Sequence, residues 1–283
     1  MNAITSAAIS MERFDRRYIF LVIFVIVLFP LLMPIGLPIR VSKEAMGAYE
    51  AIDKIPPGSK IYFACDYDPG SMPELHPMTI AILNHLFSHN VKVIGACLWP
   101  GGPPLLEEAL NKVGVQKYGK KYGVDFVNLG YKEGREVVMV SLGRSIPTTF
   151  PDDFYGTPIS QLPVMQGVRS LNDVAMIVNI SAGYPGTKEW VQQVQSRYHV
   201  ILAAGCTAVS APEYYPYYQS GQLVGLLGGL AGAAEYEKLV GVAGTATRGM
   251  DAQSLGHLAI ILFIALGNFL YLYLKKKGKL TRR

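Results

Sequence analysis

The chain has 283 residues, half of them hydrophobic, and a formal net charge of +5. The excess charge comes from the two ends, because residues 40–251 hold 17 Lys and Arg against 19 Asp and Glu. A segment this close to neutral lacks the basic surface that nucleic acid requires, so we expect no nucleic-acid partner. Cys65, Cys97 and Cys206 are too few for a disulfide framework, and we expect small buried residues; one bridged pair in an oxidising compartment is the alternative.

Two long apolar segments near the ends predict membrane-spanning helices. Residues 18–39 carry no charge, and residues 252–274 carry none apart from a possible charge on His257. About 20 apolar residues cross a hydrocarbon core of ~30 Å, so both segments are long enough. The first is longer than the core of a cleaved signal peptide and no small-x-small cleavage site follows it, so we expect it to remain as an anchor.

The basic residues outside these segments predict the orientation. The tail 1–17 contains Arg13, Arg16 and Arg17, and the tail 275–283 contains only basic residues among its charged ones. Lys and Arg beside a span stay on the cytoplasmic side. We therefore expect a two-pass protein in the plasma membrane of a bacterium, with the lipid bilayer as a partner, both termini in the cytoplasm and the segment between the spans outside.

Between the two predicted spans the sequence alternates helix-like and strand-like patterns, in the order 42–54, 60–65, 77–89, 91–99, 103–114, 124–131, 133–146, 173–181, 187–198, 199–206 and 222–240. The segment 133–146 fits either state, and we favour a helix. The strand-like segments are short apolar runs, which are typical of parallel strands covered on both faces. The pattern predicts one α/β domain over 40–242, a doubly wound and mostly parallel Rossmann-like sheet, joined by a linker at 243–251 to the second span.

In such a sheet, ligands bind beyond the carboxyl ends of the strands. The segments that follow the predicted strands therefore supply the candidate ligand-binding residues. These residues are Asp66, Asp68, Trp99, Gly101, Gly102, Ser181, Tyr184 and Cys206.

The pair Asp66 and Asp68 is the strongest candidate for chemistry among them. A DxD at the end of a first strand resembles the opening motif of haloacid-dehalogenase-like phosphatases, which implies an attacking Asp and a magnesium site. The resemblance covers about nine residues, Gly70 replaces the usual Thr, and the later acidic motif is missing. We favour the alternative that both residues cap the turn and the helix that follows.

Three histidines lie in one predicted helical region. His85 and His89 are one helical turn apart, a spacing that suits a metal ion. His89 lies in Ser88-His89-Asn90, which is typical of a solvated helix end. The sequence therefore predicts no metal ligand and no cofactor, and Cys206 has no evident base that would make it a nucleophile.

Three features favour contacts with other proteins. Four tyrosines crowd the predicted loop 212–218, and glycines recur in the predicted helix 222–240, where they would allow close backbone approach. Asn268 places an amide in the second predicted span, where it would favour a partner inside the bilayer. The candidate interface residues are Tyr214, Tyr215, Tyr217, Tyr218, Gly225, Gly228, Gly229, Gly232 and Asn268.

Three segments together resemble a family of bacterial membrane-anchored α/β proteins that has no assigned activity: FACDYDPGSMPELHP, LWPGGPPLLEEAL and YYQSGQLVGLLGGLAGAAEYE. The resemblance implies the architecture and no mechanism. We expect a non-enzymatic module that assembles with itself or with another membrane protein. The alternative is a divalent-metal hydrolase or a small-ligand-binding domain centred on Asp66 and Asp68.

Overall fold

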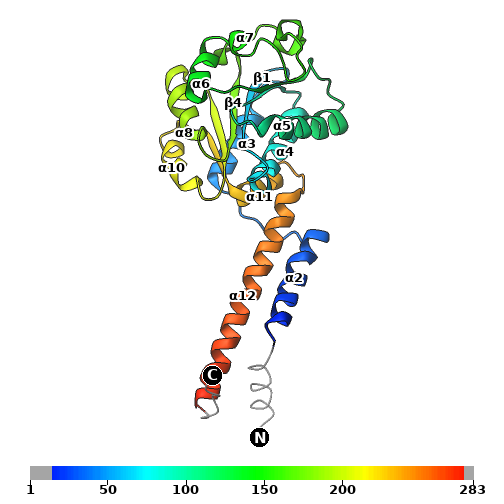
Figure 1. Ribbon diagram of the computed structural model, residues 1–283, viewed down its shortest axis with the longest axis vertical. Helices are drawn as coiled ribbons and strands as arrows, with labels where there is room; N and C mark the ends of the chain where they lie inside the picture. Colours follow the sequence, from blue (N-terminus) through cyan, green and yellow to red (C-terminus); the bar gives the residue numbers. More distant parts are fainter. Residues whose placement is uncertain (1–14, 277–283) are drawn as a thin grey trace. The chain divides into compact units, whose positions relative to one another are not determined.

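The computed structural model describes residues 15–276, which form two compact units (Figure 1). One is an α/β unit, Pro38–Thr247. The other is a helical unit, made of the described residues up to Leu37 together with those from Arg248 onward.

The α/β unit contains a six-stranded sheet in which every neighbouring pair is parallel and the order is β3-β2-β1-β4-β5-β6. The predicted parallel α/β fold is therefore confirmed. Strand order reverses between β1 and β4, which makes that position the topological switch point of the sheet. The strands are β1 (Lys60–Asp66), β2 (Lys92–Cys97), β3 (Phe126–Tyr131), β4 (Met176–Ser181), β5 (Leu202–Cys206) and β6 (Gly225–Gly228).

Helices cover both faces of this sheet (Figure 1). One face packs against α3 (Lys43–Asp53), α4 (Met72–Ser88), α5 (Gly102–Ala109), its π-helical continuation η1 (Leu110–Lys117) and α11 (Gly229–Leu239). The other packs against α6 (Arg135–Arg144), α8 (Thr187–Trp190), the π-helix η5 (Val191–Gln195), α9 (Ser196–Tyr198) and α10 (Ala211–Gln219). Short helices fill the connection from α6 to β4: α7 (Ile146–Thr149), η2 (Ile159–Gln161), η3 (Pro163–Met165) and η4 (Leu171–Asp173).

The predicted helix at 133–146 is confirmed by α6, but the prediction for 222–240 was wrong at its start. Residues Gly225–Gly228 form the edge strand β6, and the helix begins only at Gly229. A short apolar run does not by itself distinguish a strand from a helix. Here the glycines allow the close packing against a neighbouring helix that the edge strand requires. A Cβ on Gly225 would lie 2.2 Å from the backbone nitrogen of Ala48, so α3 lies directly on this strand.

The helical unit contains α2 (Arg16–Leu32) and α12 (Thr245–Lys276), which continues into it from the α/β unit. Over residues 15–276, α12 alone is long and apolar enough to cross a membrane. The prediction of two membrane helices is thus supported only at the second segment. α2 has 17 residues and ends at Leu32, which gives a length of about 26 Å, below the ~30 Å of a hydrocarbon core.

Asp251 fixes the backbone that follows α2. Its carboxylate accepts hydrogen bonds from the backbone N–H groups of Ile35, Gly36 and Leu37 at 2.8–2.9 Å. These residues have left the helix and have no helical acceptors, so one buried carboxylate replaces three backbone partners. The position belongs to α12, which begins at Thr245, so most of the predicted linker 243–251 is helical.

We predict that Gly225→Ala lowers the free energy of unfolding of the α/β unit by about 1–3 kcal/mol, because the added methyl group would overlap the α3 backbone. Both tryptophans, Trp99 and Trp190, lie in this unit, so tryptophan fluorescence during denaturant unfolding measures it specifically. Gly183→Ala is the matched control, because a Cβ there meets its nearest atom at 3.8 Å. Equal stability of the two variants would contradict the assigned packing.

Candidate ligand site at the carboxyl ends of the strands

A pocket of about 230 Å³ lies at the carboxyl ends of β2, β3 and β4. The residues that line it follow these strands in the chain: Leu98, Trp99, Pro100, Tyr131, Glu133, Gly134, Arg135, Tyr184 and Pro185. Its position beside the β1–β4 switch point is where open α/β sheets bind ligands. Two predicted rim residues, Trp99 and Tyr184, are therefore brought together in one cavity.

Local contacts hold the aromatic walls of this pocket. The indole Nε1–H of Trp99 donates to the carbonyl of Pro185 at 2.9 Å, which joins the segment after β2 to the segment after β4. The hydroxyl of Tyr184 donates to Glu136 at 2.7 Å, while the Tyr184 ring remains about half exposed. The rings are thus oriented while part of their surface stays available to a ligand.

Arg135 supplies the positive charge of the pocket. It is the first residue of α6, and its φ of 50° is an uncommon backbone conformation for a residue with a side chain. Its guanidinium carbon lies 5.1 Å from the centre of the Tyr184 ring, a cation–π arrangement. Strained backbone of this kind concentrates at functional sites, and here it accompanies the one cationic side chain among the residues that line the pocket.

Beneath the pocket, Asp66 is fully buried at the end of β1. One carboxylate oxygen accepts from the backbone N–H of Leu98 at 2.7 Å; the other accepts from Asn179 Nδ2 and Trp190 Nε1, both at 2.9 Å. These donors come from the β2–α5 turn, from β4 and from α8. Asp66 therefore holds together the elements that frame the pocket.

Burial raises the pKa of Asp66 to about 7, against the opposing effect of the hydrogen bonds from Leu98, Trp190 and Asn179, which favour the ionised form. The carboxylate is enclosed and its oxygens are used by donors of the protein. This arrangement fits a structural role better than the ligation of magnesium in the phosphatase-like interpretation.

Asp68 caps the turn after β1, as the alternative interpretation predicts. Its Oδ1 accepts from the backbone N–H groups of Gly70 and Ser71, at 3.0 and 3.3 Å, and from the Ser71 hydroxyl at 3.0 Å. The prediction that both residues cap this turn is therefore confirmed for Asp68 and wrong for Asp66, whose donors come from Leu98, Asn179 and Trp190 in the interior.

The other predicted rim residues are packing residues. A Cβ on Gly101 would lie 3.1 Å from Asp68 Cβ, and one on Gly102 would lie 2.4 Å from the Cys65 carbonyl oxygen. Ser181 is buried, and its hydroxyl accepts from the backbone N–H of Thr187 at 3.1 Å, which fixes the start of α8.

Cys206 is buried at the end of β5, and burial raises the pKa of its thiol to about 12. A thiol that stays protonated at neutral pH is a poor nucleophile. Cys65 and Cys97 are buried as well, and all three cysteines are free. The prediction of small buried residues is confirmed.

The predicted interface residues are used mainly inside the α/β unit. The tyrosine segment is helix α10; Tyr214 is buried in the core, Tyr217 and Tyr218 pack against it, and Tyr215 is exposed. The loop prediction was wrong because Pro212 occupies the first turn of a helix, where proline is tolerated.

The glycines are likewise enclosed by their own unit. A Cβ on Gly228 would meet Ala211, one on Gly229 would meet Ala208, and one on Gly232 would meet Leu227, all at or below 2.9 Å. Asn268, in contrast, lies exposed on α12.

The sequence prediction missed Tyr131, Glu133 and Arg135 in the pocket. Tyr131 ends β3, and the same rule about strand ends that selected Trp99 would have selected it. Because the helix α6 follows β3 directly in the chain, the first residues of this helix lie near the carboxyl end of β3.

No protein-family model, curated protein or solved structure matches this chain. The site therefore has to be judged from its own geometry.

We predict that Asp66→Asn destabilises the α/β unit most at low pH. Asn keeps one acceptor oxygen, but its amide would face the Leu98 N–H, donor against donor, which costs about 1–3 kcal/mol. In the wild type, the raised pKa means that the folded state holds a proton that the unfolded state loses. Protonation of Asp66 therefore contributes fully to the free energy of unfolding below about pH 4. This contribution declines as the pH rises to about 7, with a slope of at most ~1.4 kcal/mol per pH unit.

The measurement is the difference in unfolding free energy between wild type and Asp66→Asn at pH 5 and pH 8, followed by tryptophan fluorescence. The difference should shrink at pH 8. Asp68→Asn, which keeps an acceptor for the turn, is the matched control. A difference that is constant between the two pH values would refute a raised Asp66 pKa.

Proposed function

We propose that this chain is a membrane-anchored α/β protein whose pocket at the strand ends binds a small planar anion. One observation carries the proposal: a cavity of about 230 Å³ that combines aromatic walls with a cation beside the topological switch point. This is the small-ligand alternative drawn from the sequence, with its centre moved from Asp66 and Asp68 to Trp99, Arg135 and Tyr184.

The chemistry of the walls selects the ligand class. Trp99, Tyr131 and Tyr184 offer ring faces and edges, on which a planar group stacks. The guanidinium of Arg135 carries N–H donors in a fixed plane, which matches a carboxylate or phosphate group. Glu133, also in the pocket, suits a ligand that carries a hydrogen-bond donor at its other end.

The membrane part of the proposal rests on the helical unit. We propose that α12 crosses the bilayer and that residues 18–39 enter it as a second span, in the plasma membrane of a bacterium, with both termini in the cytoplasm. The apolar side chains of α2 support this: Phe20, Phe24 and Leu32 are each at least 60 % exposed, which water disfavours and lipid accepts.

We predict that a planar anion quenches tryptophan fluorescence saturably in the full-length protein in mild detergent. Trp99 lines the pocket while Trp190 is fully buried, so the change measures the pocket. The probes are benzoate and adenosine monophosphate, with benzamide and adenosine as their uncharged counterparts. Arg135→Gln should weaken binding of the anions about 10-fold or more, the loss of a charge-assisted hydrogen bond.

Lys132→Gln is the matched control, because it removes a neighbouring cation that does not line the pocket. Tyr184→Leu should weaken anion binding as well, by removing the stacking surface and the contact that orients Arg135. Quenching that is equal for charged and neutral probes, or unchanged in Arg135→Gln, would contradict the proposal.

A second function, assembly through the membrane, is favoured by Asn268. Its amide is exposed on an otherwise apolar stretch of α12, where lipid offers no hydrogen-bond partner. We propose that Asn268 pairs with a second copy or with another membrane protein.

We predict that mild detergent extraction yields an oligomer or a complex, and that Asn268→Leu weakens it. Interhelical hydrogen bonds contribute about 0.6–1.7 kcal/mol, so the dissociation constant should rise roughly 3- to 20-fold. Native mass spectrometry measures the assembly, with Leu262→Val, another exposed position of α12, as control. A strict monomer with no co-purifying protein would rule assembly out.

A further inference from the structure

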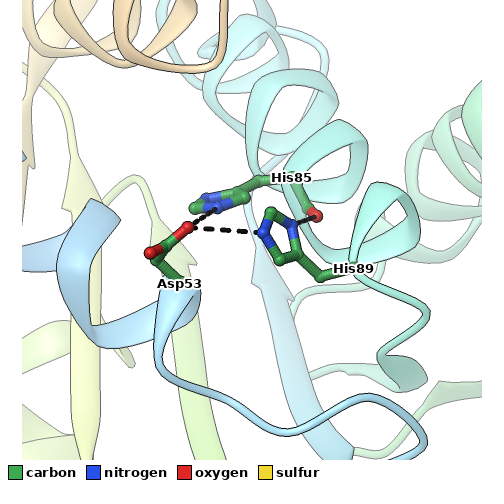
Figure 2. Close-up of side chains that lie close together, drawn as sticks. All are labelled: Asp53, His85 and His89. Carbon is green, nitrogen blue, oxygen red and sulfur yellow. Dashed lines mark hydrogen bonds and ion pairs between the residues drawn. The ribbon is translucent and has the colours of Figure 1, made fainter.

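Asp53, His85 and His89 come together in one cluster, and their side chains point toward one another (Figure 2). Asp53 ends α3, His85 lies in the last turn of α4, and His89 is the residue after α4. α3 leads into β1 and α4 leads into β2, so the three side chains gather at the amino ends of the strands.

The spacing of their ligand atoms suits one metal ion. Asp53 Oδ1 lies 3.3 Å from His89 Nε2 and 3.7 Å from His85 Nε2, and the three ligand atoms lie within 4.8 Å of one another. In tetrahedral geometry with metal–ligand distances of about 2.0–2.1 Å, ligand atoms stand roughly 3.4 Å apart. Small rotations of exposed side chains close the remaining difference.

Hydrogen bonds at the far side of each ring leave the Nε2 atoms free for ligation. His89 Nδ1 lies 3.1 Å from both the carbonyl oxygen of His85 and the hydroxyl oxygen of Ser88. The Ser88 hydroxyl donates its own proton to that carbonyl at 2.7 Å, so the proton between Nδ1 and these two oxygens is carried by Nδ1. His85 Nδ1 lies 2.8 Å from the hydroxyl of Tyr236, whose oxygen can accept a hydrogen bond from Nδ1–H. The His85 ring stacks on Tyr49, with 4.5 Å between the ring centres. Metal-binding histidines are oriented by contacts of this kind.

One buried nitrogen of the cluster lacks a hydrogen-bond partner and faces a carboxylate, an arrangement that a cation would stabilise. His85 is 2 % exposed, and its Nε2 has no hydrogen-bond partner among the described residues, although it points toward the Asp53 carboxylate (Figure 2). With Nδ1 protonated, His89 also directs a lone pair at that carboxylate. One proton between His89 and Asp53 would satisfy that pair but leave His85 Nε2 unpaired; one metal ion would satisfy all three.

We propose that Asp53, His85 and His89 bind a divalent transition-metal ion, best suited to Zn²⁺, through Oδ1 and two Nε2 atoms. Two imidazoles and one carboxylate are donors that Zn²⁺ accepts and that Mg²⁺ and Ca²⁺, which prefer oxygen, do not favour. The side chains of His89 and Asp53 are 37 % and 50 % exposed, so water reaches the fourth position.

His85 is the buried member of the cluster. Burial and the neighbouring His89 together lower the pKa of His85 to about 4, while Asp53 opposes the change. The sequence showed the spacing of His85 and His89 but not the third ligand, which α3 supplies from a distance in the chain.

The test uses the full-length protein in mild detergent, freed of metal with a chelator and titrated with Zn²⁺ by calorimetry. Wild type should bind one Zn²⁺ per chain with submicromolar affinity. Asp53→Asn and His89→Gln change exposed side chains, so these variants should fold, and each should weaken binding at least 100-fold. Tyr236→Phe, which removes the partner of His85 Nδ1, should weaken it 10- to 100-fold.

Two controls separate the site from general binding to surface groups. Glu50→Gln removes an acid from the same helix α3, and His199→Asn removes an exposed histidine at a left-handed position that Asn tolerates; both should bind Zn²⁺ like wild type. Co²⁺ in place of Zn²⁺ should give the intense visible absorption of four-coordinate cobalt in wild type and in both controls, but not in Asp53→Asn or His89→Gln. Absent binding in wild type, or binding that survives in Asp53→Asn and His89→Gln, would overturn the proposal.

Discussion

The buried carboxylate of Asp66 is the contact on which the pocket end of the sheet depends. It joins β1 to the β2–α5 turn through Leu98, to β4 through Asn179 and to α8 through Trp190. These elements meet at the topological switch point between the paired strands β1 and β4, where the connections that follow the two strands leave in opposite directions. Beyond the ends of these strands, the enclosed carboxylate with its three donors links the segments that follow them, and its desolvation raises its pKa.

The fold was easier to predict from the sequence than the candidate site. The alternation of apolar runs and helical patterns is local, so five of the six strands and the parallel sheet follow from the sequence. β6 does not follow from the sequence, because the need for glycine at Gly225 comes from the close approach of the α3 backbone. That contact joins residues more than 170 positions apart in the chain. A pattern read along the chain contains no information about that neighbour.

The site was predicted in part for a related reason. Trp99 and Tyr184 follow strands, and parallel strands bring their carboxyl ends to one edge. Asp66 was found by the same rule, but its role was not, because only the packed structure shows three donors around it. Asp53 follows no strand, and its proximity to His85 and His89 depends on how α3 packs beside α4. Chemistry assembled from helix ends is invisible to a rule about strand ends.

The pocket lies at the carboxyl ends of the strands and the cluster of Asp53, His85 and His89 at their amino ends, and between these ends α4 has 17 residues and therefore runs about 26 Å. The first turn of α4 follows the turn that Asp68 caps after β1, and its last turn carries His85 near the amino ends of the strands. A charge gained at one end is screened over a Debye length of about 8–10 Å before it reaches the other. Direct electrostatic effects between the sites are therefore small, and any mutual influence has to pass through movement of α4 itself.

Because twelve residues of this helix are buried, such movement would disturb much of the core. We therefore expect the two proposed sites to bind their ligands independently of each other.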